Sequence, residues 1–216
     1  MKKIIIIVEG QTEVEFFKRI VFPYLHRFGI TEFIAYPAQT SIGYKGGNRY
    51  PYIRNEIQKI LKRYDNQVVV STFFDYYGLH SSFPDMVKSK SKPQIEESVK
   101  ALEDAIFKDL NDERVLPYIQ LHEFEALLFS SPAGFELYHP EVSAEINQIM
   151  EQYSNPEYIN DHPDTAPSKR ILQLINNYNK VVEGVEIAEI IGMDIILEKC
   201  ARFRQWLETL TRTAQQ

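Results

Sequence analysis

The opening MKKIIIIVEGQTEVEFFK constrains the fold more than any other part of the chain. Residues 4–8 form an apolar run that is too short for a membrane span and dense enough for a strand buried on both faces. The run stops at Glu9-Gly10, and an amphipathic helix follows at once. A carboxylate therefore lies where a buried parallel strand ends, which is where open α/β sheets usually carry their chemistry.

The helix that follows this strand is predicted from its cap and its apolar stripe. Thr12 with Glu15 three residues later predicts a capping box, which places the helix start at Glu13. From this first turn, Glu13 can face the same crevice as Glu9. The alternative interpretation is that Glu9 only ends the strand and Glu13 only favours the helix dipole. The apolar stripe consists of Val14, Phe17, Val21 and Leu25.

The composition is that of a soluble globular protein, with 216 residues, 44% hydrophobic and 25% charged. This length predicts one domain, or a domain with a helical appendage. The single cysteine, Cys200, excludes an intramolecular disulfide and a cysteine zinc cluster. The start of the chain lacks the pattern of a signal peptide, and no run approaches the roughly 18 apolar residues of a membrane span. Cytoplasmic residence without a membrane partner is therefore expected.

The formal charge of −6 argues against a protein that coats nucleic acid by bulk electrostatics. It does not argue against a metal-dependent enzyme that acts on phosphodiesters, because bound cations reverse the charge of an acidic site locally.

Strands and helices alternate in the first 130 residues, which predicts βαβ units around a mainly parallel sheet and an α/β fold. After residue 130 the pattern is helical and interrupted by prolines. We therefore expect an α/β core at 1–130 and a helical portion at 131–216 packed on it. The expected strands are 32–36, 67–74 and 115–121, and the expected helices are 52–64, 94–111, 122–129, 168–180 and 194–210. Cys200 falls on an apolar helical stripe and is expected in the core.

Acidic residues follow three of the predicted strands, at Glu9, at Asp75 and at the pair Glu123 and Glu125. Magnesium and manganese favour hard oxygen ligands, so carboxylates from several strand ends suit a site for either ion. Two such ions can activate a water and stabilise the leaving oxygen in phosphodiester cleavage. The alternative for Glu123 and Glu125 is that they are solvated acids in a first helical turn.

The chain resembles the Toprim superfamily, which includes topoisomerases, DnaG-type primases and the overcoming-lysogenization-defect (OLD) nucleases. It is most similar to an uncharacterised bacterial family of stand-alone Toprim-like proteins, over nearly its full length. VEGQTE, with its second Glu four residues after the first, is closest to the OLD branch. The stretches that carry the resemblance are VEGQTEVEFF, TFFDYYGL, QLHEFEALLFS, APSKRI and CARFRQWLETL.

This resemblance implies a Toprim, Rossmann-like fold and a site for Mg²⁺ or Mn²⁺. The metal ligands would be Glu9, Glu13, Asp75, Glu123 and Glu125, and Lys169 would stabilise developing negative charge. The usual Toprim Asp-x-Asp reads Asp75-Tyr76-Tyr77 here, so its second acid is missing. This departure weakens a topoisomerase or primase interpretation, whereas OLD-type nucleases spread their acids over several strand ends.

Basic residues outside the acidic set are candidates for phosphate binding. Lys45 and Arg49 lie in a glycine-bearing loop where backbone and guanidinium could approach a phosphate, and Arg170 follows Lys169. The alternative for all of them is a solvated surface.

The leading hypothesis is therefore a metal-dependent nuclease that cleaves DNA or RNA. The resemblance also implies an ABC or SMC-like ATPase partner in antiphage defence, and the sequence has no Walker A pattern of its own. The rival is a non-catalytic module that uses a Toprim scaffold to bind an ATPase or a phage protein. A nucleotidyl transferase is a third alternative, for which the sequence indicates no nucleotide pocket.

Overall fold

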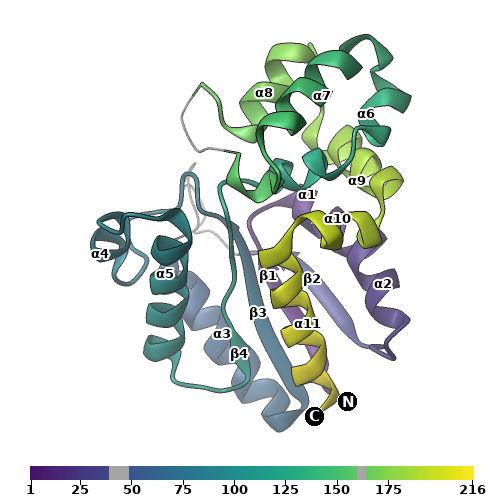
Figure 1. Ribbon diagram of the computed structural model, residues 1–216. Coiled ribbons are helices and arrows are strands. Elements are labelled where there is room, and N and C mark those ends of the chain that lie inside the picture. The colour runs from purple at the N-terminus through teal and green to yellow at the C-terminus, as the bar shows by residue number, and fades with distance from the viewer. Residues whose placement is uncertain (39–48, 160–163) are drawn as a thin grey trace.

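The apolar run at the start of the chain forms the strand β1, and the sheet is built around it. The computed structural model describes residues 1–38, 49–159 and 164–216. All strand pairs are parallel, in the order β2-β1-β3-β4, with β5 also paired to β3 (Figure 1). The predicted α/β class is therefore confirmed. The strands are β1 (Lys3–Val8), β2 (Phe33–Pro37), β3 (Val68–Asp75), β4 (Val115–Leu116) and β5 (Ile119–Gln120).

Helices cover both faces of the sheet and the carboxyl ends of its strands (Figure 1). The α-helices are α1 (Gln11–Phe16), α2 (Phe22–His26), α3 (Tyr50–Tyr64), α4 (Met86–Lys90), α5 (Ile95–Leu110), α6 (Ala133–Tyr138), α7 (Ser143–Gln152), α8 (Pro167–Leu174), α9 (Val185–Ile191), α10 (Met193–Lys199) and α11 (Ala201–Gln215). The other helical segments are η1 (Phe17–Val21) and η6 (Lys180–Gly184), both π-helical, and the 3₁₀ segments η2 (Asp65–Gln67), η3 (Phe124–Ser130), η4 (Pro140–Val142) and η5 (Pro156–Tyr158).

Alternate side chains of β1 enter two apolar cores, as a pleated strand buried on both faces requires. Ile4 and Ile6 pack with α1, α2 and α11, whereas Ile5 and Ile7 pack with α3 and α5. The central strand β3 is buried along all eight of its residues. The sheet is thus a middle layer between two helical layers.

The first helix begins earlier than the sequence predicts. Gly10, with extended backbone, is its N-cap, and the Glu13 carboxylate accepts the Gly10 N–H at 2.8 Å. The predicted capping box of Thr12 and Glu15 is therefore wrong, because Glu13 satisfies the cap from within the first turn. Glu15 instead accepts a hydrogen bond from Gln11 at 3.0 Å.

Several predicted elements are divided in the structure. The strand expected at 115–121 is broken into β4 and β5 around Pro117, which has no N–H for a ladder hydrogen bond. The helix expected at 122–129 is 3₁₀, and α4 is a short helix that lies outside the expected elements. The helix expected at 168–180 ends at Leu174, and that expected at 194–210 divides into α10 and α11 at Cys200. Cys200 is buried in the core, as predicted.

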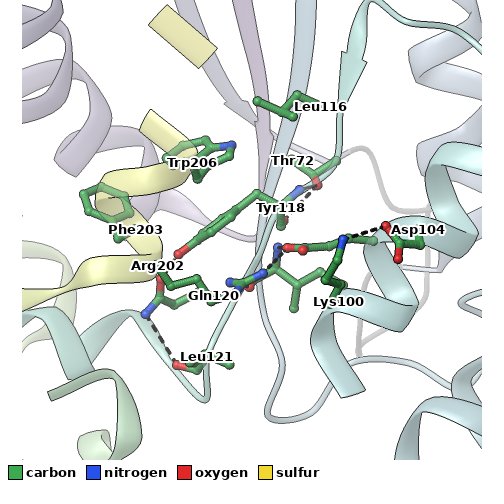
Figure 2. Close-up of polar contacts among 12 residues, drawn as sticks. Thr72, Lys100, Asp104, Leu116, Tyr118, Gln120, Leu121, Arg202, Phe203 and Trp206 are labelled. Atoms are coloured by element: carbon green, nitrogen blue, oxygen red, sulfur yellow. Dashed lines mark hydrogen bonds and ion pairs between the residues drawn. The ribbon is translucent and has the colours of Figure 1, made fainter. Parts of the chain in front are cut away.

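The last helix, α11, packs on the sheet through aromatic and polar contacts around Tyr118 (Figure 2). The Trp206 ring stacks on Tyr118 with centroids 4.5 Å apart, and its indole N–H donates to Ser71 Oγ at 3.0 Å. The Arg202 guanidinium lies 4.6 Å from the Tyr118 ring and donates to the Ile119 carbonyl and to Glu103. In the described part of the chain, no helix is long and apolar enough to cross a membrane.

Candidate metal centre

The register of the sheet brings the acidic strand ends together at one edge. Val8 pairs with Phe73, and Asp75 pairs with Gln120, so Glu9 leaves β1 beside the end of β3. The Asp75 backbone N–H donates to Glu9 Oε2 at 3.3 Å. Glu9 and Asp75 therefore lie at the same carboxyl edge of a parallel sheet.

Glu13 and Asp75 are each held by one carboxylate oxygen, which leaves the other oxygen turned to a common centre. Glu13 Oε2 accepts the Gly10 N–H at 2.8 Å, and Asp75 Oδ1 accepts the Phe124 N–H at 2.9 Å. Their remaining oxygens lie 3.6 Å and 3.8 Å from Lys180 Nζ. Backbone amides therefore orient both carboxylates toward the position of the lysine ammonium.

Glu125 completes the inner part of this cluster. Its side chain is 1% exposed, and its Oε2 lies 3.2 Å from Lys180 Nζ. Both carboxylate oxygens are buried, and in the described part of the chain the Lys180 ammonium is their charged partner. A buried carboxylate without directional hydrogen bonds is costly unless a cation lies beside it.

Glu123 points to a different side of the same edge. It lies in extended backbone just before η3, whereas Glu125 lies within η3. Its Oε2 accepts the Ser168 N–H at 2.9 Å, so it binds the first turn of α8. His122, with a positive φ of 60°, turns the chain between β5 and Glu123. Glu123 therefore lies in the turn before η3, and Glu125 lies inside η3.

The electrostatics of the cluster follow from burial and from the crowding of like charges. Burial raises the pKa of Asp75 well above its usual value, and Glu9, Glu13 and Glu125 raise it further against the opposing effect of Lys180. Burial is also the main cause that raises the pKa of Glu125. Glu9 reaches solvent at the rim, yet desolvation of its carboxylate and the charge of Glu13 raise its pKa.

Lys180 is the residue that sequence reasoning missed. Burial alone would lower its pKa, but Asp75, Glu125 and Glu13 together raise the pKa above the ordinary lysine value. It is the first residue of η6, and the Asn179 side chain caps this turn by accepting the N–H groups of Val181 and Val182. An asparagine N-cap at this point is the one sequence signal for a helix start at Lys180.

The other predicted site residues lie outside the contacts of Lys180. Lys169 is exposed in α8, next to the Ser168 amide that binds Glu123. Arg170 donates to the Thr165 carbonyl at 2.8 Å and to the Tyr153 hydroxyl at 3.1 Å. Arg49 is the exposed N-cap residue of α3, and Lys45 lies outside the described residues. The roles assigned to these four residues stay predictions.

The donor set suits a hard divalent cation. Carboxylate oxygens are the ligands that Mg²⁺ and Mn²⁺ favour, and Glu125 contributes two buried ones whose charged neighbour is Lys180. Within residues 1–38, 49–159 and 164–216, no three Asp, Glu, His or Cys side chains are arranged as the ligands of one metal ion. In this arrangement the Lys180 ammonium lies among the carboxylates instead.

Comparison with known families matches residues 8–211 to a domain of unknown function, DUF4276. The chain belongs to the DUF4276 family. The matched range includes every member of the acidic cluster and Lys180. Neither the curated proteins nor the solved structures gave a match to this DUF4276 protein.

Proposed function

We propose that this DUF4276 protein is a divalent-metal-dependent nuclease of Toprim type, which hydrolyses phosphodiester bonds in DNA or RNA. The observation that carries the proposal is the shared orientation of Glu13, Asp75 and Glu125. These side chains come from three separate elements, and an oxygen of each lies within 3.2 to 3.8 Å of one ammonium group. Such convergence at the carboxyl ends of parallel strands is typical of an active site.

The proposed roles follow from where each side chain lies. Mg²⁺ or Mn²⁺ would be held by carboxylates of the cluster: Glu9, Glu13, Asp75, Glu123 and Glu125. When bound, the metal supplies water activation and stabilisation of the leaving oxygen. The backbone amides of Gly10 and Phe124 keep two of these carboxylates oriented. Lys169 is exposed next to the Ser168 amide that binds Glu123, and its positive charge would stabilise a phosphate of the substrate.

The proposal includes a partner protein that hydrolyses ATP. Because the sequence has no Walker A pattern, an ABC or SMC-like ATPase would supply any ATP hydrolysis, in the antiphage context implied by the Toprim resemblance. The nuclease assay is therefore run with the isolated protein and with the neighbouring ATPase, where one is encoded.

The decisive experiment is the Glu9→Gln variant. Glutamine preserves size and hydrogen bonding but removes the charge that would hold the cation, so cleavage in Mg²⁺ or Mn²⁺ should fall by roughly a hundredfold or more. The matched control is Glu145→Gln, on the exposed side of α7, which should cleave like wild type. A folded Glu9→Gln protein that cleaves at the wild-type rate would reject the mechanism, as would wild-type cleavage in EDTA.

Two observations favour the alternative, a non-catalytic interaction module on the same scaffold. The position of the second acid after Asp75 is Tyr77, and Lys180 already balances part of the cluster charge. Calorimetric titration with MnCl₂ separates the two proposals, because a scaffold does not need a metal. Absence of metal binding together with tight binding to a partner would favour the module.

A further inference from the structure

The ammonium of Lys180 occupies the place toward which the free carboxylate oxygens are turned. Its Nζ lies 3.2 Å from Glu125, 3.6 Å from Glu13 and 3.8 Å from Asp75. The two remaining oxygens of Glu13 and Asp75 are held by backbone amides, so these side chains cannot turn away without losing a hydrogen bond. The carboxylate oxygens that face the lysine are therefore the ones that would bind a metal ion at this site.

A lysine ammonium and a divalent ion repel each other and need the same oxygens. A metal ion binds carboxylate oxygens directly at roughly 2.0–2.2 Å, which leaves no room for a second cation among these three groups. We propose that Lys180 is an internal competitor of the divalent cation, so that metal binding displaces its ammonium from the cluster toward solvent. This inference rests on the proposed function and adds a regulatory element to it.

The structure gives Lys180 a way out of the cluster. Its side chain is 37% exposed, whereas those of Glu13 and Glu125 are 3% and 1% exposed. The lysine backbone is fixed at the start of η6 by the Asn179 cap, and Glu183 in turn accepts the Asn179 N–H at 3.3 Å. The four-carbon side chain can therefore rotate outward while the helix start and the acids stay in place.

Metal affinity tests the competition directly. Calorimetric titration with MnCl₂ is carried out on wild type, on Lys180→Gln and on the control Lys108→Gln, an exposed lysine of α5. Removing the competing charge should tighten Mn²⁺ binding in Lys180→Gln by roughly tenfold or more, and Lys108→Gln should match wild type. Equal or weaker binding by a folded Lys180→Gln protein would overturn the inference.

A second measurement uses the wild-type protein, so it does not depend on the folding of a variant. Acetic anhydride labels accessible lysine amines, and mass spectrometry reports each site. Lys180 should be labelled several-fold more slowly than Lys108 in EDTA, and saturating MgCl₂ should abolish that protection without changing Lys108. Continued protection of Lys180 with metal bound would contradict the displacement.

The outcomes separate the two proposals. A protein that binds metal and cleaves nucleic acid while Lys180 stays protected would preserve the nuclease and reject the competition. A protein that binds metal, releases Lys180 and cleaves nothing would support the competition and reject the nuclease. Absence of metal binding by both wild type and Lys180→Gln would reject both.

Discussion

Glu157 shows how a single buried carboxylate can join distant parts of this chain. It is fully buried, and its two oxygens accept the N–H groups of Arg202 and Phe203 at 2.9 Å and 3.0 Å. It therefore caps the start of α11 from a segment more than forty residues earlier. Burial raises the pKa of Glu157, and the two amides oppose that shift only in part.

This raised pKa predicts a pH dependence of stability. The folded protein holds a proton on Glu157 at pH values where the unfolded chain has lost it, so the contribution of Glu157 falls as pH rises above 4.5. Glu157→Gln cannot titrate at this position. The free energy of unfolding of wild type minus that of Glu157→Gln should decrease from pH 4.5 upward, measured by urea denaturation. A difference that is constant with pH would contradict the prediction.

At the residue scale, the acids of the candidate site could be predicted and the lysine could not. Glu9, Asp75 and the Glu123 segment each follow an apolar strand, and parallel strands bring their carboxyl ends to one edge. Lys180 does not follow a strand. It lies at the start of η6, after the chain has left α8 at Leu174. The position of the Lys180 ammonium among the carboxylates depends on the tertiary packing of η6.

At the element scale, α6 and α9 pack closely enough to require a glycine. A Cβ added at Gly134 would lie 2.7 Å from Ile187 Cγ2 and 2.8 Å from the Ile187 carbonyl oxygen. The carbonyl oxygen, and the Ile187 Cα at 3.0 Å, belong to the backbone of α9, which cannot rotate away as a side-chain end can. Since η6 runs directly into α9, this contact also helps to hold the segment that starts with Lys180.

Gly134→Ala should therefore destabilise the protein although alanine is the better helix former. Overpacking against a helix backbone costs about 1–3 kcal/mol, which exceeds the gain of about 1 kcal/mol in helix propensity. The control is Leu137→Ala on the same helix, where the side chain is 69% exposed and a change within about 0.5 kcal/mol is expected. Urea denaturation measures both. Equal stability of Gly134→Ala and wild type would show that the two helices can separate freely.

The existence of most strands and long helices follows from the periodicity of apolar residues, but their ends do not. The break between β4 and β5 depends on contacts made by distant side chains as well as on Pro117. The Tyr118 N–H donates to Thr72 Oγ1 at 3.0 Å, and the Ile119 N–H donates to Glu103 Oε1 at 2.8 Å. At this point side chains accept the hydrogen bonds that strand carbonyls would accept in a regular sheet. The periodicity of apolar residues does not include these contacts and therefore predicts a continuous strand.

At the scale of the whole molecule, one apolar core joins the first strand to the last helix. It extends from Ile4 in β1 to Ala214 in α11, and it includes residues of η3, α6 and α9. The division into a core at 1–130 and a helical portion at 131–216 stays a prediction, and the shared core predicts that both parts unfold together.

Trp206 offers a direct measurement of this cooperativity, because it is the single tryptophan of the chain and lies in α11. Its fluorescence reports the docking of α11, whereas far-ultraviolet circular dichroism reports all helices. The two signals should give the same urea midpoint. An earlier midpoint for Trp206 fluorescence would mean that α11 leaves the sheet as a separate unit.

The position of α11 also has a consequence for synthesis on the ribosome. The helix covers a face of the central strand through Phe203 and Trp206, and near its end the Ala214 carbonyl accepts the Lys2 N–H at 2.7 Å. The termini therefore lie side by side (Figure 1). A nascent chain that has already made β1 and β3 must keep this sheet face uncovered until α11 has been translated. Its apolar face is accessible to chaperones until then, and the core closes only when α11 clears the exit tunnel.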